Sequence, residues 1–252
     1  AVAAMAVGAT PAGLSPTNAP EECAYVIDHS ESPVVLVQDS DQLNKVLAKR
    51  AELPRLRHVV LMGDATSDGA LTWDEFIQRG REVSDADLDA RMNALGPRDG
   101  ATLIYTSGTT GPPKAVMLPH EALAYMARTL IEVIPVGPGD RVISYLPLSH
   151  IAEQVVSLLT PAISGHTVYY EKDIRRLADT IKEVRPTAFF AVPRVWEKFY
   201  AGVNEKLGAA TGVKKALADR AVAVGRKRTH ADNRGEAPSG WLSMPYGLFD
   251  TL

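Results

Sequence analysis

The sequence predicts an α/β fold with mainly parallel sheets and helices on both faces. Short apolar runs rich in β-branched residues alternate with segments of helical spacing along most of the 252 residues. This alternation favours parallel pairing, because the connecting helices cover the faces of the sheet. A hydrophobic content of 46% supports a substantial core, and a net charge of −3 gives no electrostatic reason to expect nucleic-acid binding.

The N-terminal segment, 1–14, is apolar, but no basic residues and no initiating Met precede it. It is also too short and too interrupted to span a bilayer. We interpret it as the end of a buried helix followed by a strand, in a chain whose true N-terminus is missing. Thr17 or Asn18 can cap the next helix, and Pro20 suits its first turn. Cys23, the single cysteine, lies in this helix and is expected to be buried in a protein of a reducing compartment.

The remaining elements follow from periodicity, β-branched composition and turn residues. The predicted strands are 33–38, 56–62, 101–106, 114–118, 141–147, 166–170 and 187–192. The predicted helices are 41–51, 73–81, 85–94, 121–134, 151–163, 174–184, 194–207 and 214–228, followed by a loop over 229–245. One apolar stripe on helix 121–134 is expected to lie in the core: Leu123, Met126, Ala127, Leu130 and Ile134. The chain is expected to hold two α/β parts, 1–96 and 97–252.

One loop, between strands 101–106 and 114–118, has a composition that suits a polyphosphate. No side chain from Thr106 to Gly111 is larger than threonine, and a single cation, Lys114, follows. Glycines let backbone N–H groups converge on an anion, hydroxyls donate further hydrogen bonds, and the ammonium supplies charge. The candidate phosphate-binding residues are Thr106, Ser107, Gly108, Thr109, Thr110, Gly111 and Lys114.

A Walker loop does not fit these residues. Pro112 and Pro113 separate Gly111 from Lys114, and no Gly-Lys-Ser/Thr leads into a helix. An ordinary hairpin loop is the other alternative, but the apolar strands on both sides and the lysine at the mouth favour phosphate.

The run Tyr-Thr-Ser-Gly-Thr-Thr-Gly-Pro-Pro-Lys, residues 105–114, resembles the phosphate-loop signature of the AMP-forming acyl-adenylating enzymes. That superfamily includes acyl-CoA synthetases, luciferases and the adenylation domains of peptide synthetases. Ala115 departs from the pattern, because the family usually has glycine after the lysine. The resemblance implies that residues 106–111 and Lys114 hold the β- and γ-phosphates of ATP.

A second motif, Tyr-Leu-Pro-Leu-Ser-His-Ile-Ala, places Ser149 and His150 where strand 141–147 gives way to a helix. Open α/β sheets bind ligands beyond the carboxyl ends of such strands. Position alone favours a structural histidine. The motif is similar to the second core motif of long-chain acyl-CoA synthetases, which implies that His150 borders the acyl carboxylate.

A third motif, Val-Pro-Arg-Val-Trp-Glu-Lys, again follows a predicted strand. Its Arg194 could meet an anion or pair with Glu197 at i,i+3, and both alternatives stay open. This motif, the His150 motif and Pro-Thr-Asn-Ala-Pro-Glu-Glu-Cys-Ala-Tyr are similar to the bubblegum-type branch of long- and very-long-chain acyl-CoA synthetases. The resemblance therefore covers nearly the whole chain in order.

The resemblance implies an ATP-dependent long-chain fatty acid–CoA ligase. The carboxylate attacks the α-phosphate of ATP, giving acyl-adenylate and pyrophosphate, and the CoA thiol then displaces AMP. ATP, CoA and the fatty acid are the expected ligands, with Mg²⁺ neutralising the triphosphate and no metal ligand assigned in this chain. Lys114 and His150 are the expected catalytic residues, and His150 and Arg194 the expected substrate contacts. The alternatives are adenylation of an amino or aryl acid, and a non-catalytic nucleotide-binding module.

Later motifs of the family lie outside this sequence, among them Tyr-Gly-x-Thr-Glu and the catalytic lysine of a C-terminal domain. We therefore interpret the chain as an incomplete N-terminal adenylating domain, and expect no ligase activity and at most weak nucleotide binding from it alone. The basic stretch 214–228 is a candidate for contact with an anionic membrane surface or with the CoA phosphates; a solvated helix face is the alternative. A cytoplasmic protein is expected, with any peripheral membrane contact made there.

Overall fold

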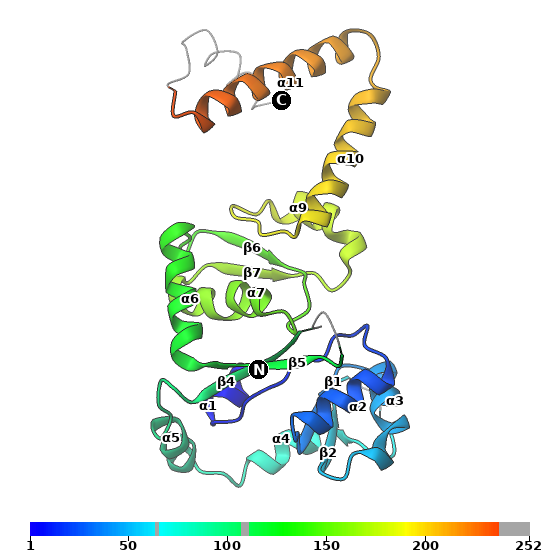
Figure 1. The fold of residues 1–252 in the computed structure, drawn as a ribbon, viewed down its shortest axis with the longest axis vertical. Coiled ribbons are helices and arrows are strands. Elements are labelled where there is room, and N and C mark those ends of the chain that lie inside the picture. Colours follow the sequence, from blue (N-terminus) through cyan, green and yellow to red (C-terminus); the bar gives the residue numbers. More distant parts are fainter. Residues whose placement is uncertain (64–65, 107–110, 237–252) are drawn as a thin grey trace. The chain divides into compact units, whose positions relative to one another are not determined.

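The structure, a computed structural model, describes residues 1–63, 66–106 and 111–236 (Figure 1). The chain divides into two compact units, Ala1–Phe189 and Phe190–Leu252. Three of the four strand pairings among the described residues are parallel, as the sequence predicts. The expected division into parts 1–96 and 97–252 stays a prediction.

The first sheet contains three parallel strands in the order β1 (Val34–Val37), β2 (His58–Leu61) and β3 (Leu71–Thr72). The connection from β1 to β2 contains α3 (Ser40–Ala48) and the 3₁₀ turn η1 (Arg50–Glu52). Asp39 caps α3 by accepting the Gln42 N–H at 3.0 Å. The core between sheet and helices is fully buried at Leu43 and Val60, each 0% exposed.

Two helices precede this sheet, α1 (Val2–Ala6) and α2 (Pro20–His29). The N-cap of α2 is Ala19, rather than the predicted Thr17 or Asn18, because the Glu22 carboxylate accepts the Ala19 N–H at 2.9 Å and replaces a side-chain cap. Cys23 is buried as predicted, and this burial raises the pKa of its thiol. The strand predicted within 1–14 is reduced to a single bridge between Ala12 and Leu103.

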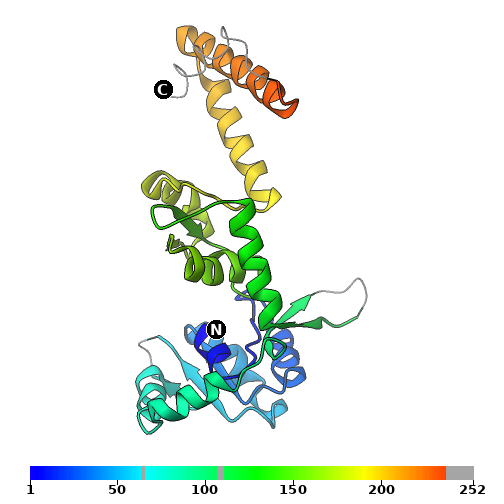
Figure 2. The ribbon, with the colours of Figure 1, turned by 90° about the vertical axis from the view of Figure 1, so that its left-hand side faces the viewer.

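The middle of the chain forms an antiparallel hairpin from β4 (Gly100–Thr106) and β5 (Lys114–Pro119). Two helices with exposed charged faces, α4 (Trp73–Gly80) and α5 (Asp85–Asn93), lead into it from β3. Pro11 lies along the other side of β4, where its carbonyl accepts the Leu103 N–H at 3.0 Å and the Thr102 hydroxyl at 3.1 Å. Both strands predicted beside the phosphate loop are therefore present. Figure 2 shows the hairpin and the helix that leads away from β5.

That helix, α6 (His120–Val133), buries Leu123 and Ala127, and Leu123 lies in a cluster with Met5 and Ala101. The predicted core stripe is wrong at its edges, because Met126 is 51% exposed and Ile134 is 48% exposed. Met126 lies at the border of the stripe, and Ile134 has left the helix, which ends one residue earlier.

The last sheet pairs β6 (Arg141–Ser144) with β7 (Thr167–Tyr170) in parallel. The predicted helix between them is present as α7 (Ile151–Gln154), a π-helical turn η2 (Val155–Leu159) and α8 (Thr160–Ser164). Gly165 ends it with a φ of +74°, a left-handed conformation that glycine adopts without steric cost. The 3₁₀ turn η3 (Ile174–Arg176) and α9 (Leu177–Val184) follow β7.

The predicted strand 187–192 is wrong: these six described residues contain no strand. The Thr187 and Ala188 N–H groups both point at the Arg141 carbonyl, at 2.9 and 3.4 Å. Because both donors share one acceptor, the alternating register of a β-ladder is not established.

The second unit contains α10 (Pro193–Ala209) and α11 (Gly212–Asn233). The loop predicted from residue 229 is wrong over 229–233, because α11 continues through them. Its last turn is held by the Thr229 hydroxyl on the Gly225 carbonyl and by an Arg228–Asp232 pair at i,i+4. Among the described ranges, no helix is both long and apolar enough to cross a membrane.

Candidate functional site

The phosphate loop, residues 106–114, is held by the open end of the β4–β5 hairpin. Thr106 of β4 and Lys114 of β5 are register partners, so the hairpin brings these two predicted site residues together. Both side chains are exposed at the strand ends. The other predicted members from Ser107 to Thr110 lie outside the described residues, which leaves Gly111 as the remaining described member.

Gly111 has a φ of +83°, in the left-handed region that side chains with a Cβ atom rarely adopt. A Cβ atom there would meet no heavy atom within 4 Å. Glycine is therefore required at this position by the backbone conformation and not by crowding.

His150 stands beyond the carboxyl end of β6, at the N-cap of α7. Its N–H donates to the Pro147 carbonyl at 3.0 Å, and its carbonyl accepts the Glu153 and Gln154 N–H groups at 3.1 and 3.2 Å. The backbone is thus fixed on both sides, while the imidazole is exposed. The predicted location, at the edge where a strand gives way to a helix, is confirmed; its substrate role stays a prediction.

A buried polar cluster behind His150 was not predicted from the sequence. The Glu153 carboxylate is only 2% exposed, and it accepts hydrogen bonds from the Ser144 hydroxyl and, at 2.6 Å, from the Ser157 hydroxyl. Gln154 donates its side-chain N–H to the Leu148 carbonyl at 2.7 Å. The cluster therefore ties β6, α7 and the His150 loop together. Its sequence signal was the i,i+4 pair of Glu153 and Ser157 in an otherwise apolar helix.

Arg194 lies near the start of α10, in the second unit. Its guanidinium contacts the Glu197 carboxylate at 3.1 Å, with side chains 79% and 63% exposed. Of the two alternatives left open by the sequence, the i,i+3 ion pair is the one that this conformation contains. Such an exposed pair contributes little stability.

The family profile of AMP-binding enzymes matches residues 1–230. The chain therefore belongs to the family of AMP-binding enzymes.

Two curated relatives carry the likeness further. The chain is 35% identical over 247 residues to the long-chain-fatty-acid–CoA ligase ACSBG2 of Xenopus laevis, which covers 94% of this chain and 33% of that protein. It is 36% identical over 215 residues to the long-chain-fatty-acid–CoA ligase ACSBG1 of Bos taurus, covering 81% of this chain and 30% of that protein. The chain spans about a third of the length of these relatives. The resemblance to the bubblegum-type branch is thereby confirmed.

Solved structures with the same fold include an anthranilate CoA ligase, AuaEII, in complex with anthranoyl-AMP. The TM-score is 0.64 at 24% identity, over 73% of this chain and 35% of that chain. A long-chain-fatty-acid-CoA ligase, FadD1, from Archaeoglobus fulgidus gives a TM-score of 0.58 at 22% identity, over 81% and 38% of the two chains. The predicted α/β class, that of the acyl-adenylating enzymes, is confirmed by these likenesses.

Proposed function

We propose that this chain is part of the N-terminal domain of an ATP-dependent long-chain fatty acid–CoA ligase that works through an acyl-adenylate. The observation that carries the proposal is the phosphate-loop sequence at the open end of the β4–β5 hairpin, in a chain of the AMP-binding family. Both curated relatives named above are called long-chain-fatty-acid–CoA ligases, which supports the choice of acid.

In the proposed reaction, Lys114 and the loop residues stabilise the pyrophosphate that leaves when the fatty carboxylate attacks the α-phosphate. The CoA thiol then displaces AMP. Charge on the transferring group is stabilised by fixed N–H groups and an ammonium, the usual source of catalysis in such transfers. The resemblance of its motif to that of long-chain acyl-CoA synthetases implies that His150 borders the acyl carboxylate, and its fixed backbone and exposed imidazole support this role. Arg194 is a second substrate contact, reached only when its exposed pair with Glu197 opens.

Magnesium enters this proposal only with the nucleotide. Among the described residues, no group of three or more His, Cys, Asp or Glu side chains is arranged to hold a metal ion. Mg²⁺ retains water and phosphate oxygens as ligands when it binds with ATP. We therefore assign it no protein ligand in this chain and derive no step through it.

The substrate class is tested by ATP–pyrophosphate exchange with the full-length protein against a panel of fatty, aryl and amino acids. Exchange with long-chain fatty acids is expected. Exchange with amino or aryl acids alone would overturn the proposed substrate class, and absence of exchange with every acid would favour a non-catalytic nucleotide-binding module. The 252-residue chain alone is expected to form no acyl-CoA; robust formation would contradict its assignment as a partial domain.

The role of Lys114 is tested by Lys114→Ala in the same assay. Because the side chain is exposed at the end of β5, we expect a slower exchange rate with an unchanged thermal midpoint. The matched control is Lys172→Ala, at an exposed lysine after β7. Equal exchange kinetics in the two variants would remove Lys114 from the phosphate site.

A further inference from the structure

Helix α2 contacts both strands at the base of the phosphate loop. The Tyr25 hydroxyl donates to the Pro113 carbonyl at 2.8 Å, immediately before β5. On the other strand, the Tyr105 hydroxyl lies 2.9 Å from His29 Nδ1. These contacts join residues 88 and 76 positions apart in the sequence. One helix face therefore contacts the residues on both sides of the loop, Tyr105 and Pro113.

The three rings of this contact pack as a cluster. Tyr25 and His29 lie 5.3 Å apart between ring centroids, and Tyr105 meets them edge-on at 6.4 and 5.7 Å. Edge-to-face pairs at these distances are favourable beyond simple burial. Burial also raises the pKa of the Tyr105 phenol, so the ring stays neutral and keeps its hydroxyl proton for a hydrogen bond. The cluster therefore fixes the side-chain direction of Tyr105, the residue before Thr106.

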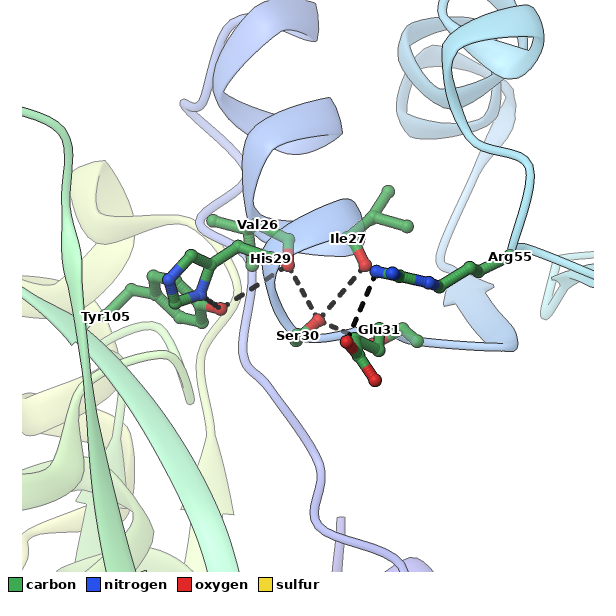
Figure 3. A network of polar contacts seen from close by, with 8 residues as sticks. Val26, Ile27, His29, Ser30, Glu31, Arg55 and Tyr105 are labelled. Carbon is green, nitrogen blue, oxygen red and sulfur yellow. Dashed lines mark hydrogen bonds and ion pairs between the residues drawn. The ribbon is translucent and has the colours of Figure 1, made fainter.

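The helix behind the rings is itself held in place, which a positioning element requires. Its Ala24 and Ile27 side chains are buried in the core cluster of the first sheet. At its C-terminus the Ser30 hydroxyl donates to the Val26 carbonyl at 2.6 Å, and Glu31 pairs with Arg55 at 3.3 Å (Figure 3). Movement of the rings relative to the core would break these contacts.

We propose that Tyr25 and His29 are positioning residues for the phosphate loop, setting the separation and orientation of its two ends for the nucleotide. The described contacts of both side chains are with residues that flank the loop, so we assign them a positioning role and not a catalytic one. The inference rests on the proposed function, since it takes the loop to bind the phosphates of ATP. It adds a determinant on α2 that the loop sequence does not contain.

Tyr25→Phe in the full-length protein removes only the hydroxyl that holds Pro113. We expect the KM for ATP in pyrophosphate exchange to rise about two- to tenfold, the range that corresponds to one lost hydrogen bond. The KM for the fatty acid and the thermal midpoint should stay at wild-type values. The matched control is Tyr125→Phe, the same chemical change at an exposed tyrosine on α6, 68% exposed. The inference would be overturned if the two variants had the same KM for ATP, or if Tyr25→Phe raised the KM for ATP and the KM for the fatty acid equally.

His29 is tested by a pair of variants. His29→Leu removes the nearer of two polar partners of the Tyr105 hydroxyl, the other being the Val26 carbonyl at 3.5 Å, whereas His29→Asn keeps a polar atom near the position of Nδ1. We expect His29→Leu to raise the KM for ATP and His29→Asn to restore most of the loss, because the role depends on one hydrogen bond. If both variants behave alike, the hydrogen bond to Tyr105 does not position the loop.

A readout without turnover separates this inference from the proposed function. Amide hydrogen exchange of the peptide that covers the ends of β4 and β5 should be faster in Tyr25→Phe than in Tyr125→Phe, with the first sheet unchanged. If amide hydrogen exchange is faster in Tyr25→Phe but the wild-type protein activates no fatty acid, the proposed function fails and the positioning of the loop stands. If the amides do not respond, the positioning role fails whatever acid the wild type accepts.

Discussion

Gly13→Ala should separate two segments that meet beside the His150 loop. A Cβ atom on Gly13 would lie 2.6 Å from the Ser149 Cα atom, 3.1 Å from its Cβ and 3.2 Å from its backbone nitrogen. Carbon atoms in contact normally stay about 3.5–4.0 Å apart, so the two backbones would have to separate by roughly 1 Å. Neither side can relieve the clash by rotating a side chain, because the nearest atom belongs to the backbone.

The expected cost follows from two opposing effects. Overpacking of this kind destabilises a protein by about 1–3 kcal/mol. Replacing glycine by alanine restricts the unfolded chain and returns about 0.4–1 kcal/mol. We therefore expect the free energy of unfolding to fall by about 1–2 kcal/mol. Separation would also strain the neighbouring hydrogen bonds from β4 to the Pro11 carbonyl.

Urea denaturation of the chain, followed by circular dichroism, measures this loss. Gly137→Ala is the matched control, because a Cβ atom at that loop glycine meets nothing within 4 Å. It should be neutral or slightly stabilising. A Gly13→Ala variant as stable as Gly137→Ala would refute the close approach of the two backbones. In the full-length protein, Gly13→Ala should raise the KM for the fatty acid more than the KM for ATP, because Ser149 adjoins His150.

Two further perturbations concern buried polar groups. Glu153→Ala leaves the Ser144 and Ser157 hydroxyls without their acceptor and should lower the free energy of unfolding, measured by urea denaturation, by about 1–3 kcal/mol. Glu153→Gln keeps an acceptor and should lower it less. Equal losses in the two variants would show that these hydrogen bonds contribute nothing to stability. Burial lowers the pKa of His166, although the nearby Asp140 carboxylate acts in the opposite direction. As the pH falls, the imidazole is therefore protonated in the unfolded chain before it is protonated in the folded chain. The free energy of unfolding should fall as the pH drops below about 6.5. His166→Gln should flatten that part of the stability–pH curve, and a curve of unchanged slope would contradict the assignment.

Much of the fold could be predicted because local signals agree with tertiary packing. Pro20 and Pro193 mark helix starts, and β-branched runs mark the strands on either side of the phosphate loop. A strand was wrongly predicted over 187–192 because the composition of this segment suits a β-strand, whereas pairing depends on register with β6, which no local pattern specifies. The error at Ala19 has a different cause, since a carboxylate one turn later satisfied the backbone group that a capping side chain usually satisfies.

The candidate site also contains some residues that local sequence motifs indicate and others that depend on tertiary packing. The loop residues and His150 could be proposed as candidates because their chemistry is concentrated in short motifs at strand ends. Glu153 was missed because its i,i+4 spacing from Ser157 is a weak signal by itself, and its second hydroxyl partner, Ser144, lies on β6 and follows only from tertiary packing. The Tyr25–Pro113 contact joins residues 88 positions apart, so it follows only from the packing of α2 beside the hairpin.

The antiparallel pairing of Thr106 with Lys114 has an entropic consequence for a bound anion. In a parallel arrangement, the two ends of such a loop would be joined through a long crossover and could be ordered only by the ligand. Here the hairpin has already closed the loop, and closing a chain segment carries a conformational cost that grows slowly with its length. That cost is met during folding, so it does not reduce the affinity for an anion that binds between Thr106 and Lys114. Preorganisation of this kind leaves more of the interaction energy for affinity.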